Sequence, residues 1–394
     1  SIFVATLLIT FTVFGIGFIA AGFIDGYNVA LNEPYDYTIN ATYEHPMTES
    51  RIEEIAEESN TVITSIKHID CLLLGVQNNY KNGERDWGSR IVVSEDNFNV
   101  LSGAAISVPK GSYTVYYDSS MEYKLNAFSA ESSLFYNPTT EQEFYFIQNE
   151  PICYDGLFNT RSVFSSFLIL NDEDYHTIAA ALANEYKAVS YMVNVENWQD
   201  TMDFQNNILE AVISDNNGLI FTNWHNSATF EKTGSQAEYL PFDGNETKIA
   251  RLWSLYPLSK LSSTTTQFEA FATYLMLMLF IAIVAFVSAV MVIGLKLIST
   301  IWDDAEVYND LRRLGMKRKK IKELITKQML FVYFIPTVLG CIIGAFTTYR
   351  IMLVSGVIYI GETMQLVGCV CGLVLIIQIA IFFVLRSKVM RNYA

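Results

Sequence analysis

Few of the side chains that commonly perform catalysis or hold metal ions occur in this sequence as part of a motif. The four histidines, His45, His68, His176 and His225, are scattered singly. The five cysteines form no Cys-x-x-Cys pair, so the sequence indicates neither a disulfide framework nor a zinc site. The phosphate-loop, His-Glu-x-x-His and Gly-x-Ser-x-Gly motifs are absent from it. We therefore predict that the chain is not an enzyme, holds no metal and does not itself hydrolyse ATP.

The most informative spacing lies between residues 299 and 327. The apolar positions that recur there at helical spacing are Ile301, Tyr308, Leu311 and Leu314. They predict a helix with one apolar face. Gly315 follows directly, and a glycine in this place is typical of a left-handed C-terminal cap. A second helix is predicted to start near Met316 and to run unbroken into an apolar segment.

The charges of these two predicted helices are ordered differently. The first begins with acidic residues and ends with basic ones, as the helix dipole favours; these are Asp303, Asp304, Glu306, Arg312 and Arg313. The second begins with Lys317, Arg318, Lys319 and Lys320. Each of these charges costs roughly 0.3–1 kcal/mol if exposed. Two explanations fit: the bases anchor the chain at an anionic membrane surface, where each is worth about 1 kcal/mol, or they form a docking surface for a cytosolic partner.

Four segments are long and apolar enough to form membrane-spanning helices, which need about 20 residues. They are residues 1–24, 268–298, 328–349 and 366–385. The first lacks the basic flank and the short apolar core of a signal peptide, so a span is the favoured interpretation. Because the sequence opens on Ser1 directly at this span, we expect the chain to be part of a longer protein. A composition of 51% hydrophobic and 17% charged residues agrees with a membrane protein.

The basic residues predict the orientation of these spans, because short cytoplasmic loops carry an excess of Lys and Arg. Residues 299–327 contain eight bases and the tail 386–394 contains three, whereas the short loop 350–365 contains one. We therefore expect both chain ends and residues 299–327 to be cytoplasmic. Residues 25–267 and 350–365 are expected on the outside.

Residues 25–267 are predicted to form a mixed α/β extracellular domain, inserted between the first two spans. With 13 Lys/Arg and 34 Asp/Glu they carry a net charge of −21, which argues against nucleic acid as a partner. Such acidity would attract cationic peptides, or it serves only solubility. Near residues 252–268 the chain becomes rich in Ser and Thr. A flexible linker and a rigid stalk fit that composition equally well.

Alternation and composition also predict individual elements of this domain. The predicted strands are residues 35–42, a pair within 61–76, and residues 91–93 and 112–117. The predicted helices are residues 49–58, with Ile52, Ile55 and Ala56 on one face, and residues 176–186.

Inside the third span, three residues bear on helix packing. Pro336 removes one backbone hydrogen bond and predicts a kink. Gly340 and Gly344 form a small-x-x-x-small pattern that allows close helix contact, although glycine is common enough in membrane helices for the pattern to arise by chance. Gly15, Gly17 and Gly22 of the first span have the same two interpretations. No ionisable residue lies at the centre of a span, which favours mechanical coupling over ion conduction.

Residues 307–328 read Val-Tyr-Asn-Asp-Leu-Arg-Arg-Leu-Gly-Met-Lys-Arg-Lys-Lys-Ile-Lys-Glu-Leu-Ile-Thr-Lys-Gln, and Phe-Ile-Pro follows at 334–336. This run resembles the signature of the FtsX-like permease family. It is most similar to the bacitracin-resistance (BceB-like) branch, in which a Tyr-x-x-Leu-x-x-Leu-Gly turn precedes a basic helix, a Lys-Gln pair and a proline in the next span. One span, a large outside domain and three further spans is also the family's repeated layout. The resemblance implies that this chain is the C-terminal half of such a permease.

The resemblance further implies an antibiotic-resistance transporter of the bacterial cell membrane. Its partner would be a separate cytosolic ABC ATPase subunit, acting as a dimer and carrying ATP and Mg, so that no cofactor belongs to this chain. The outside domain would sense or extract an antimicrobial peptide or its lipid target, and a sensor histidine kinase could join the complex. The residues matching the ATPase-coupling turn are Asp304, Tyr308, Leu311, Arg312, Arg313, Leu314, Gly315, Met316 and Lys319.

Two other functions remain open at this stage. One is an FtsX-like regulatory membrane protein that activates a cell-wall hydrolase. The other is a membrane sensor without an ATPase. A neighbouring gene for a phosphate-loop ATPase would exclude the second, and a neighbouring sensor-kinase gene would favour the permease over the first.

Overall fold

The structure is a computed structural model, and it describes residues 2–43, 47–79, 85–119, 132–159, 162, 164, 166–215, 219–221, 228–234, 239–241 and 257–392. The chain divides into two compact units. We call residues 1–28 and 265–394 the helical unit and residues 29–264 the sheet domain. Both boundaries between them fall inside helices, one in α1 (Ile2–Leu31) and one in α10 (Lys260–Asp303).

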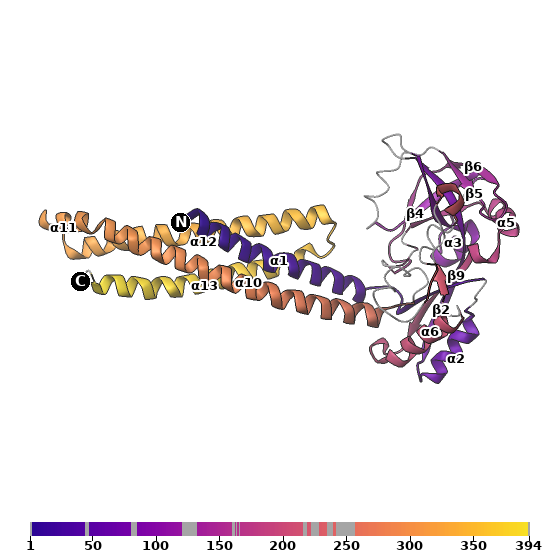
Figure 1. Ribbon diagram of the computed structural model, residues 1–394, viewed down its shortest axis with the longest axis horizontal. Coiled ribbons are helices and arrows are strands. Elements are labelled where there is room, and N and C mark those ends of the chain that lie inside the picture. Colours follow the sequence, from indigo (N-terminus) through magenta and orange to yellow (C-terminus); the bar gives the residue numbers. More distant parts are fainter. Residues whose placement is uncertain are drawn as a thin grey trace. The chain divides into compact units, whose positions relative to one another are not determined.

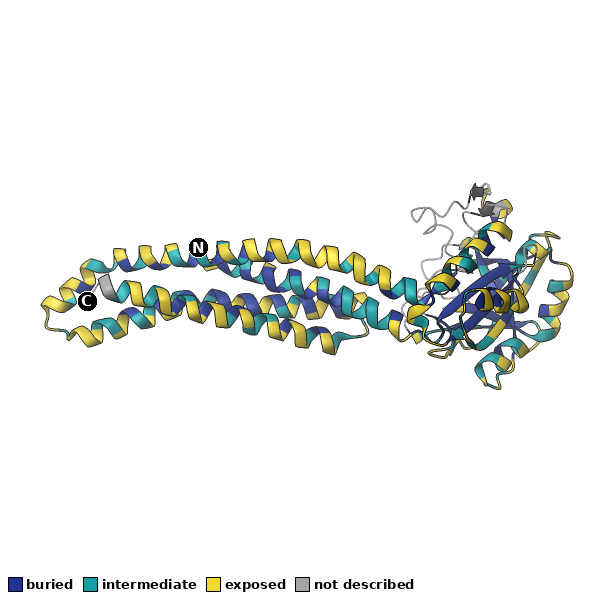
Figure 2. Ribbon diagram, turned by 90° about the horizontal axis from the view of Figure 1, so that it is seen from below, coloured by how far each residue is buried: buried dark blue, intermediate teal, exposed yellow. Residues whose placement is uncertain are grey.

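The described part of the helical unit contains four helices that are long and apolar enough to cross a membrane (Figure 1). They are α1, α10 continued by α11 (Ala305–Arg313), α12 (Arg318–Ser355) and α13 (Ile360–Asn392). Exposed positions alternate with intermediate and buried ones along these helices (Figure 2), and many of the exposed side chains are large and apolar. Such a surface suits a lipid environment and would be costly in water. Apart from Ser1, which lies outside the described residues, the four predicted spans lie within these helices.

Helix α1 packs between the other helices of this unit. It runs parallel to α12, because Ile9, Val13 and Gly17 lie against Gly340, Gly344 and Thr348 in that order. It runs antiparallel to α10, where Gly15 and Gly22 lie against Met278 and Phe271. Helices α12 and α13 form an antiparallel pair, in which Tyr333 packs on Phe382 with ring centroids 5.8 Å apart. The C-terminus of α13 lies at the same end of the unit as α11 (Figure 1).

The sheet domain contains twelve strands within its described residues. They are β1 (Tyr37–Thr42), β2 (Ile63–Asn79), β3 (Arg85–Ser94), β4 (Ser112–Tyr117), β5 (Ser132–Tyr136), β6 (Glu143–Gln148), β7 (Ile152–Cys153), β8 (Ser166–Leu170), β9 (Lys187–Val195), β10 (Leu219–Phe221), β11 (Tyr239–Pro241) and β12 (Leu258–Ser259). Its helices are α2 (Glu49–Glu58), α3 (Glu95–Ser102), α5 (Asp172–Ala180), α6 (Met202–Asp215) and α8 (Phe230–Thr233).

Six of these strands close into a ring. The pairing runs β2-β3-β8-β4-β6-β5, and β5 returns to β2 through Gly75 and Val76. A buried cluster takes side chains from each of the six strands, including Leu74, Phe135 and Leu168, and therefore fills the interior of the ring. Strands β9, β1 and β12 extend the sheet from the first half of β2. Strand β2 belongs to both parts because it is 17 residues long.

Helices α2 and α6 cover one face of the β1-β9 extension. Ile52, Ile55 and Ala56 of α2 are buried against it together with Phe204 of α6. Helix α2 begins with Thr48 as its N-cap, and Thr48 Oγ1 accepts a hydrogen bond from the Arg51 amide over 3.2 Å. The predicted helix at 49–58, with its three-residue apolar face, is confirmed, as is the predicted strand at 112–117.

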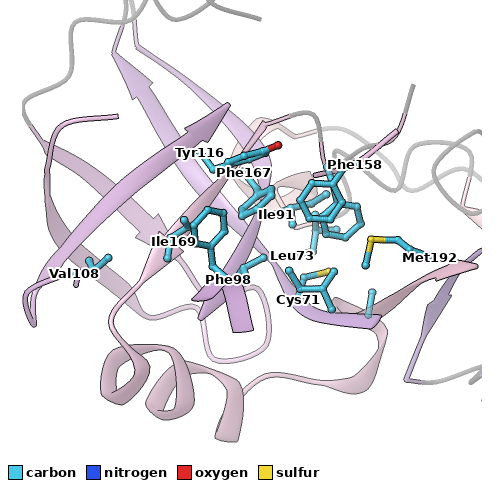
Figure 3. Packing of buried hydrophobic residues seen from close by; sticks show 14 of the residues in the cluster. Cys71, Leu73, Ile91, Phe98, Val108, Tyr116, Phe158, Phe167, Ile169 and Met192 are labelled. Carbon is cyan, nitrogen blue, oxygen red and sulfur yellow. The ribbon is translucent and has the colours of Figure 1, made fainter. Parts of the chain in front are cut away.

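A second apolar cluster lies on the outer face of the ring (Figure 3). Its centre is aromatic: Tyr116 stacks on Phe167 with ring centroids 4.5 Å apart, and Phe98 of α3 lies 5.6 Å from Tyr116. Odd-numbered residues of β2, such as Cys71 and Leu73, face this cluster, whereas even-numbered ones face the ring interior. The alternation follows from the two-residue period of a strand.

Two sequence predictions in this domain are wrong. Residues 63–76 form part of the single strand β2 and not a strand pair, because this run pairs with two different partners, first β9 and then β3. The helix predicted at 176–186 starts earlier and ends earlier, at Asp172 and Ala180. Its true start is set by Asn171, whose side chain accepts a hydrogen bond from the Glu173 amide over 3.1 Å.

The Ser/Thr-rich segment before the second predicted span is partly helical. Residues 252–256 lie outside the described residues, but Lys260 begins α10, which continues without interruption to Asp303. From residue 260 onward the segment is therefore helical and does not form a flexible linker.

Candidate functional site

The predicted coupling loop, residues 299–327, contains the end of α10, the short helix α11 and the start of α12. Helix α12 begins at Arg318, two residues later than expected, and continues to Ser355 through Pro336. The single helix expected before Gly315 is interrupted at Asp304. At this interruption the Asp304 side chain contacts α12, as described below.

Gly315 closes α11 with a paired hydrogen-bond pattern. Its φ is +91°, which confirms the predicted left-handed cap. The Met316 amide donates to the Leu311 carbonyl over 3.0 Å, and the Gly315 amide donates to the Arg312 carbonyl over 3.0 Å. These two bonds form a Schellman motif and satisfy carbonyls that the helix end leaves without partners. No atom lies within 4 Å of the position of a Cβ at Gly315, so the backbone conformation and not lack of space requires the glycine.

The apolar face of this segment is shorter than predicted. Ile301 and Tyr308 are buried and Leu311 is half-buried, but the Leu314 side chain is 83% exposed. Leu314 lies seven residues after Val307, and this spacing places the two on one side of a helix. That side faces away from α12, and Val307 is exposed as well.

A polar contact that the sequence did not reveal joins α11 to α12. The Tyr308 hydroxyl donates to Oε1 of Gln328, and Nε2 of Gln328 donates to Oδ2 of Asp304 over 2.6 Å. Gln328 thus bridges the helix interruption and the buried tyrosine. In the sequence, only the Lys-Gln pair at 327–328 pointed to Gln328, and its contacts with Asp304 and Tyr308 could be identified only from the structure.

Basic side chains surround the turn. Arg312, Arg313, Lys317, Arg318, Lys319 and Lys320 are exposed. In the described structure the first turn of α12 has no acidic residue, and the side chain of its N-cap, Lys317, makes no capping hydrogen bond. The ion pairs nearby are exposed, between Arg313 and Asp310 at 3.3 Å and between Lys327 and Glu323 at 3.0 Å. The hydrogen bond and charge of Lys327 lower the pKa of Glu323 below its usual value. Such exposed pairs add little stability.

Three large apolar side chains are exposed within residues 302–314 of the same loop, 299–327. They are Trp302, Val307 and Leu314. Together with the bases Arg312 to Lys320 they form what we call the turn surface. Met316 is half-buried beside it, and Asp304 is half-buried beneath it. The arrangement can bind a partner with an apolar centre and an acidic rim, because apolar anchors supply affinity and complementary charge supplies specificity.

The glycines predicted to pack helices face close neighbours. A Cβ on Gly340 would lie 2.8 Å from Cβ of Ile9, and one on Gly344 would lie 2.9 Å from Cβ of Val13. Gly17 and Gly22 of α1 are similarly close to Val367 and Phe271. Pro336 is buried within α12, and the helix continues through it. Gly340 and Gly344 set the distance between α1 and α12.

Within the described residues there is no group of three or more His, Cys, Asp or Glu that could hold a metal ion. The groups that the turn surface exposes are apolar and basic side chains, which can make apolar and charged contacts. No protein-family model matches this chain, and no curated protein matches it.

Proposed function

We propose that this chain is a membrane subunit of an FtsX-like, BceB-like ABC permease in the bacterial cell membrane, and that a cytosolic ABC ATPase binds its turn surface. The observation that carries the proposal is the pairing of exposed Leu314 and Val307 with exposed bases on a turn whose backbone is held by a Schellman motif. Exposed apolar groups of this size, rimmed by charge, mark interaction sites. The basic first turn of α12, unfavourable to the helix dipole, would be stabilised by an acidic partner.

In this proposal the four long helices cross the membrane, with the turn surface inside the cell and the sheet domain outside. The Lys and Arg distribution supports that orientation. Exposed Trp302 fits the interface of the inner leaflet, where indole rings are enriched. The two earlier explanations of the basic residues are therefore compatible.

The proposed mechanism is a two-state movement biased by nucleotide binding to the partner. ATP and Mg are held by the partner. Helix α12 is one candidate lever, since it runs from the turn surface at Arg318 to Ser355 without a break. Helix α1 packs against its glycine pair and leads in the chain to the sheet domain. The sheet domain, which lies within residues 25–267 with their net charge of −21, would handle a cationic antimicrobial peptide or its lipid target, and a sensor histidine kinase could bind the same complex.

Replacing Leu314 with aspartate is expected to remove the ATPase from the purified complex. The substitution places a carboxylate in the apolar centre of the turn surface, where loss of one central anchor typically weakens binding by 2 kcal/mol or more, about thirtyfold. The measurement is recovery of a phosphate-loop ATPase, identified by mass spectrometry, with the tagged chain from detergent-solubilised native membranes. Arg312→Glu is expected to weaken recovery in the same direction.

Val354→Asp is the matched control, because Val354 is also 83% exposed but lies at the other end of α12. It should leave recovery unchanged. Equal recovery with wild type, Leu314→Asp and Val354→Asp would refute docking at the turn surface. If no ATPase accompanies even the wild-type chain, the sensor alternative gains and the permease proposal fails.

The proposed orientation predicts where an impermeant thiol reagent reacts on intact cells. Cys153 is exposed in the sheet domain and should be labelled from outside, in a variant whose other cysteines are replaced by serine. A cysteine introduced in place of Lys319 should react only after the cells are permeabilised. Labelling at position 319 on intact cells would reverse the topology and overturn the function built on it.

A further inference from the structure

A lysine of the sheet domain lies between two aromatic rings on the outer face of the six-stranded ring. Nζ of Lys232, in α8, lies 4.5 Å from the centroid of Tyr136 and 5.3 Å from that of Trp87. The two rings are 6.0 Å apart and inclined by 70°, so they form two walls around the ammonium group. Both distances are within the range of a cation–π interaction. We call Trp87 and Tyr136, together with Glu143, the ammonium cage.

The sheet fixes the position of the cage. Tyr136 of β5 lies opposite Gly75 of β2, and Trp87 of β3 lies opposite Gln77, so the two rings stand on the same face of the strands on either side of β2. A Cβ on Gly75 would lie 3.2 Å from Cβ of Tyr136 and 3.0 Å from Cγ2 of Thr229. Glycine at position 75 therefore lets the segment that carries Lys232 approach the floor of the cage.

Carboxylates complete the site. Oε1 of Glu143 lies 2.5 Å from Nζ of Lys232. Glu231 accepts a hydrogen bond from the Tyr136 hydroxyl over 3.0 Å. Burial, this hydrogen bond and the nearby charges of Glu231, Glu141 and Glu143 raise the pKa of Tyr136 to about 12, so the phenol stays neutral. Aromatic faces and acidic groups around one point are the chemistry that recognises a primary ammonium ion.

The cage can exchange its occupant without opening the core. Tyr136 is only 2% exposed, but the side chains of Lys232 and Glu143 keep 28% and 39% of their surface in solvent. Helix α8 has only four residues, and Glu231 to Gly234 are all exposed. Its anchor is upstream, where buried Ala228 donates a backbone hydrogen bond to Oγ of Ser89 over 3.2 Å. Lys232 can therefore leave while Ala228 stays in place.

Next to the cage, strand β6 presents apolar side chains to solvent. Tyr145 and Ile147 are 66% and 56% exposed. They lie two and four residues after Glu143 in β6, so all three side chains are on the same face of the strand. Tyr145 lies opposite Leu134 and Glu143 opposite Tyr136, so this apolar surface continues directly from the cage. A ligand that fits both parts carries an amine and has an apolar portion beside it.

We infer that the ammonium cage and the adjoining surface of β6 bind a lysine side chain of a cationic amphipathic peptide, which displaces Lys232. A peptide is the favoured source of the ammonium group because the present occupant is itself the lysine side chain of a peptide segment. The choice of a peptide ligand rests on the proposed function. The site itself requires neither the ATPase nor the turn surface, so failure of one proposal leaves the other testable.

The test measures binding of a fluorescent synthetic peptide of leucine and lysine to the purified full chain. Lys232→Gln empties the cage and is expected to tighten binding about tenfold, because the peptide no longer competes with an internal lysine. Lys110→Gln is the matched control: it removes the same charge from the same domain, but Lys110 pairs only with exposed Glu173 and touches no aromatic ring in the described structure. Adding Trp87→Leu to the Lys232→Gln variant should cancel the gain.

A second readout does not depend on how the variants fold. In the wild-type chain, acylation of Lys232 by acetic anhydride, followed by mass spectrometry, should accelerate several-fold when the peptide is added, while acylation of Lys110 should not change. The same peptide with every lysine acetylated should have no effect. Equal effects of Lys232→Gln and Lys110→Gln together with an unchanged acylation rate would overturn the inference. Acceleration by phosphatidylethanolamine vesicles but not by the peptide would also overturn it, in favour of a lipid headgroup.

Discussion

Replacing Gly340 with isoleucine should destabilise the helical unit by about 2–3 kcal/mol. A Cβ at this position would lie 2.8 Å from both Cβ and Cγ2 of Ile9 and 3.1 Å from the carbonyl oxygen of Thr6. Neither group can move away without moving the α1 backbone. The side chain of Ile9 is branched at Cβ and therefore stiff, and the Thr6 oxygen belongs to the backbone itself. Gly344→Ile should act in the same way against Val13 and the carbonyl of Thr10. Thermal unfolding in detergent measures the loss.

Helix α13 provides the control for this prediction. Gly368 and Gly372 repeat the same four-residue spacing, but no heavy atom lies within 4 Å of a Cβ built on either. Gly368→Ile and Gly372→Ile should therefore leave the unfolding temperature close to that of the wild type. Similar losses from both pairs would show that helix propensity, and not the contact of α1 with α12, determines the effect.

Replacing Lys260 with methionine should destabilise the sheet domain by about 3–5 kcal/mol. Nζ of Lys260 lies 3.1 Å from Oδ1 of Asp36, and the two side chains are only 12% and 9% exposed. Oδ2 of Asp36 accepts a hydrogen bond from the Val195 amide over 3.0 Å, so the carboxylate is held in place. Removal of the ammonium group leaves this charge buried without its ion-pair partner, which is the costly case for an ion pair.

Urea unfolding of the full chain measures this loss, with Lys110→Met as the comparison. Lys110 pairs with Glu173 on the surface, where both side chains are more than half exposed, so its removal should change stability little. The double variant Asp36→Asn, Lys260→Met should recover part of the lost stability because no buried charge remains. A loss from Lys260→Met no larger than that from Lys110→Met would contradict the assignment of a buried ion pair.

The Asp36–Lys260 ion pair joins the two ends of the sheet domain. Asp36 precedes β1, by which the chain enters the sheet, and Lys260 begins α10, by which it leaves. The Lys260 amide also donates to the Asp36 carbonyl over 2.8 Å. The two segments that connect the domain to the rest of the chain are thus held together within it.

The sequence by itself determined the features that depend on local composition and period. Four apolar runs were sufficient to predict four long helices, since length and hydrophobicity are properties of one segment. The left-handed cap at Gly315 and the apolar face of residues 49–58 followed from spacing alone. The interruption of the helix at Asp304 was not predicted, because it involves the side chain of Gln328, which is 24 residues further along the chain. The exposure of Leu314 was not predicted either, because it depends on which side of α11 faces α12.

Only the tertiary structure decided which of several similar sequence patterns forms a helix contact or a binding site. Gly340 and Gly344 have the same spacing as Gly368 and Gly372, yet α1 fills one pair and leaves the other open. Closure of the six-stranded ring joins Gly75 to Tyr136, and the ammonium cage together with its occupant Lys232 takes its groups from four elements between residues 87 and 232. Contacts of that sequence separation depend on how the whole chain packs. The periodicity of a single segment does not predict these contacts, because the partner of each residue depends on which strands and helices the rest of the fold places next to it.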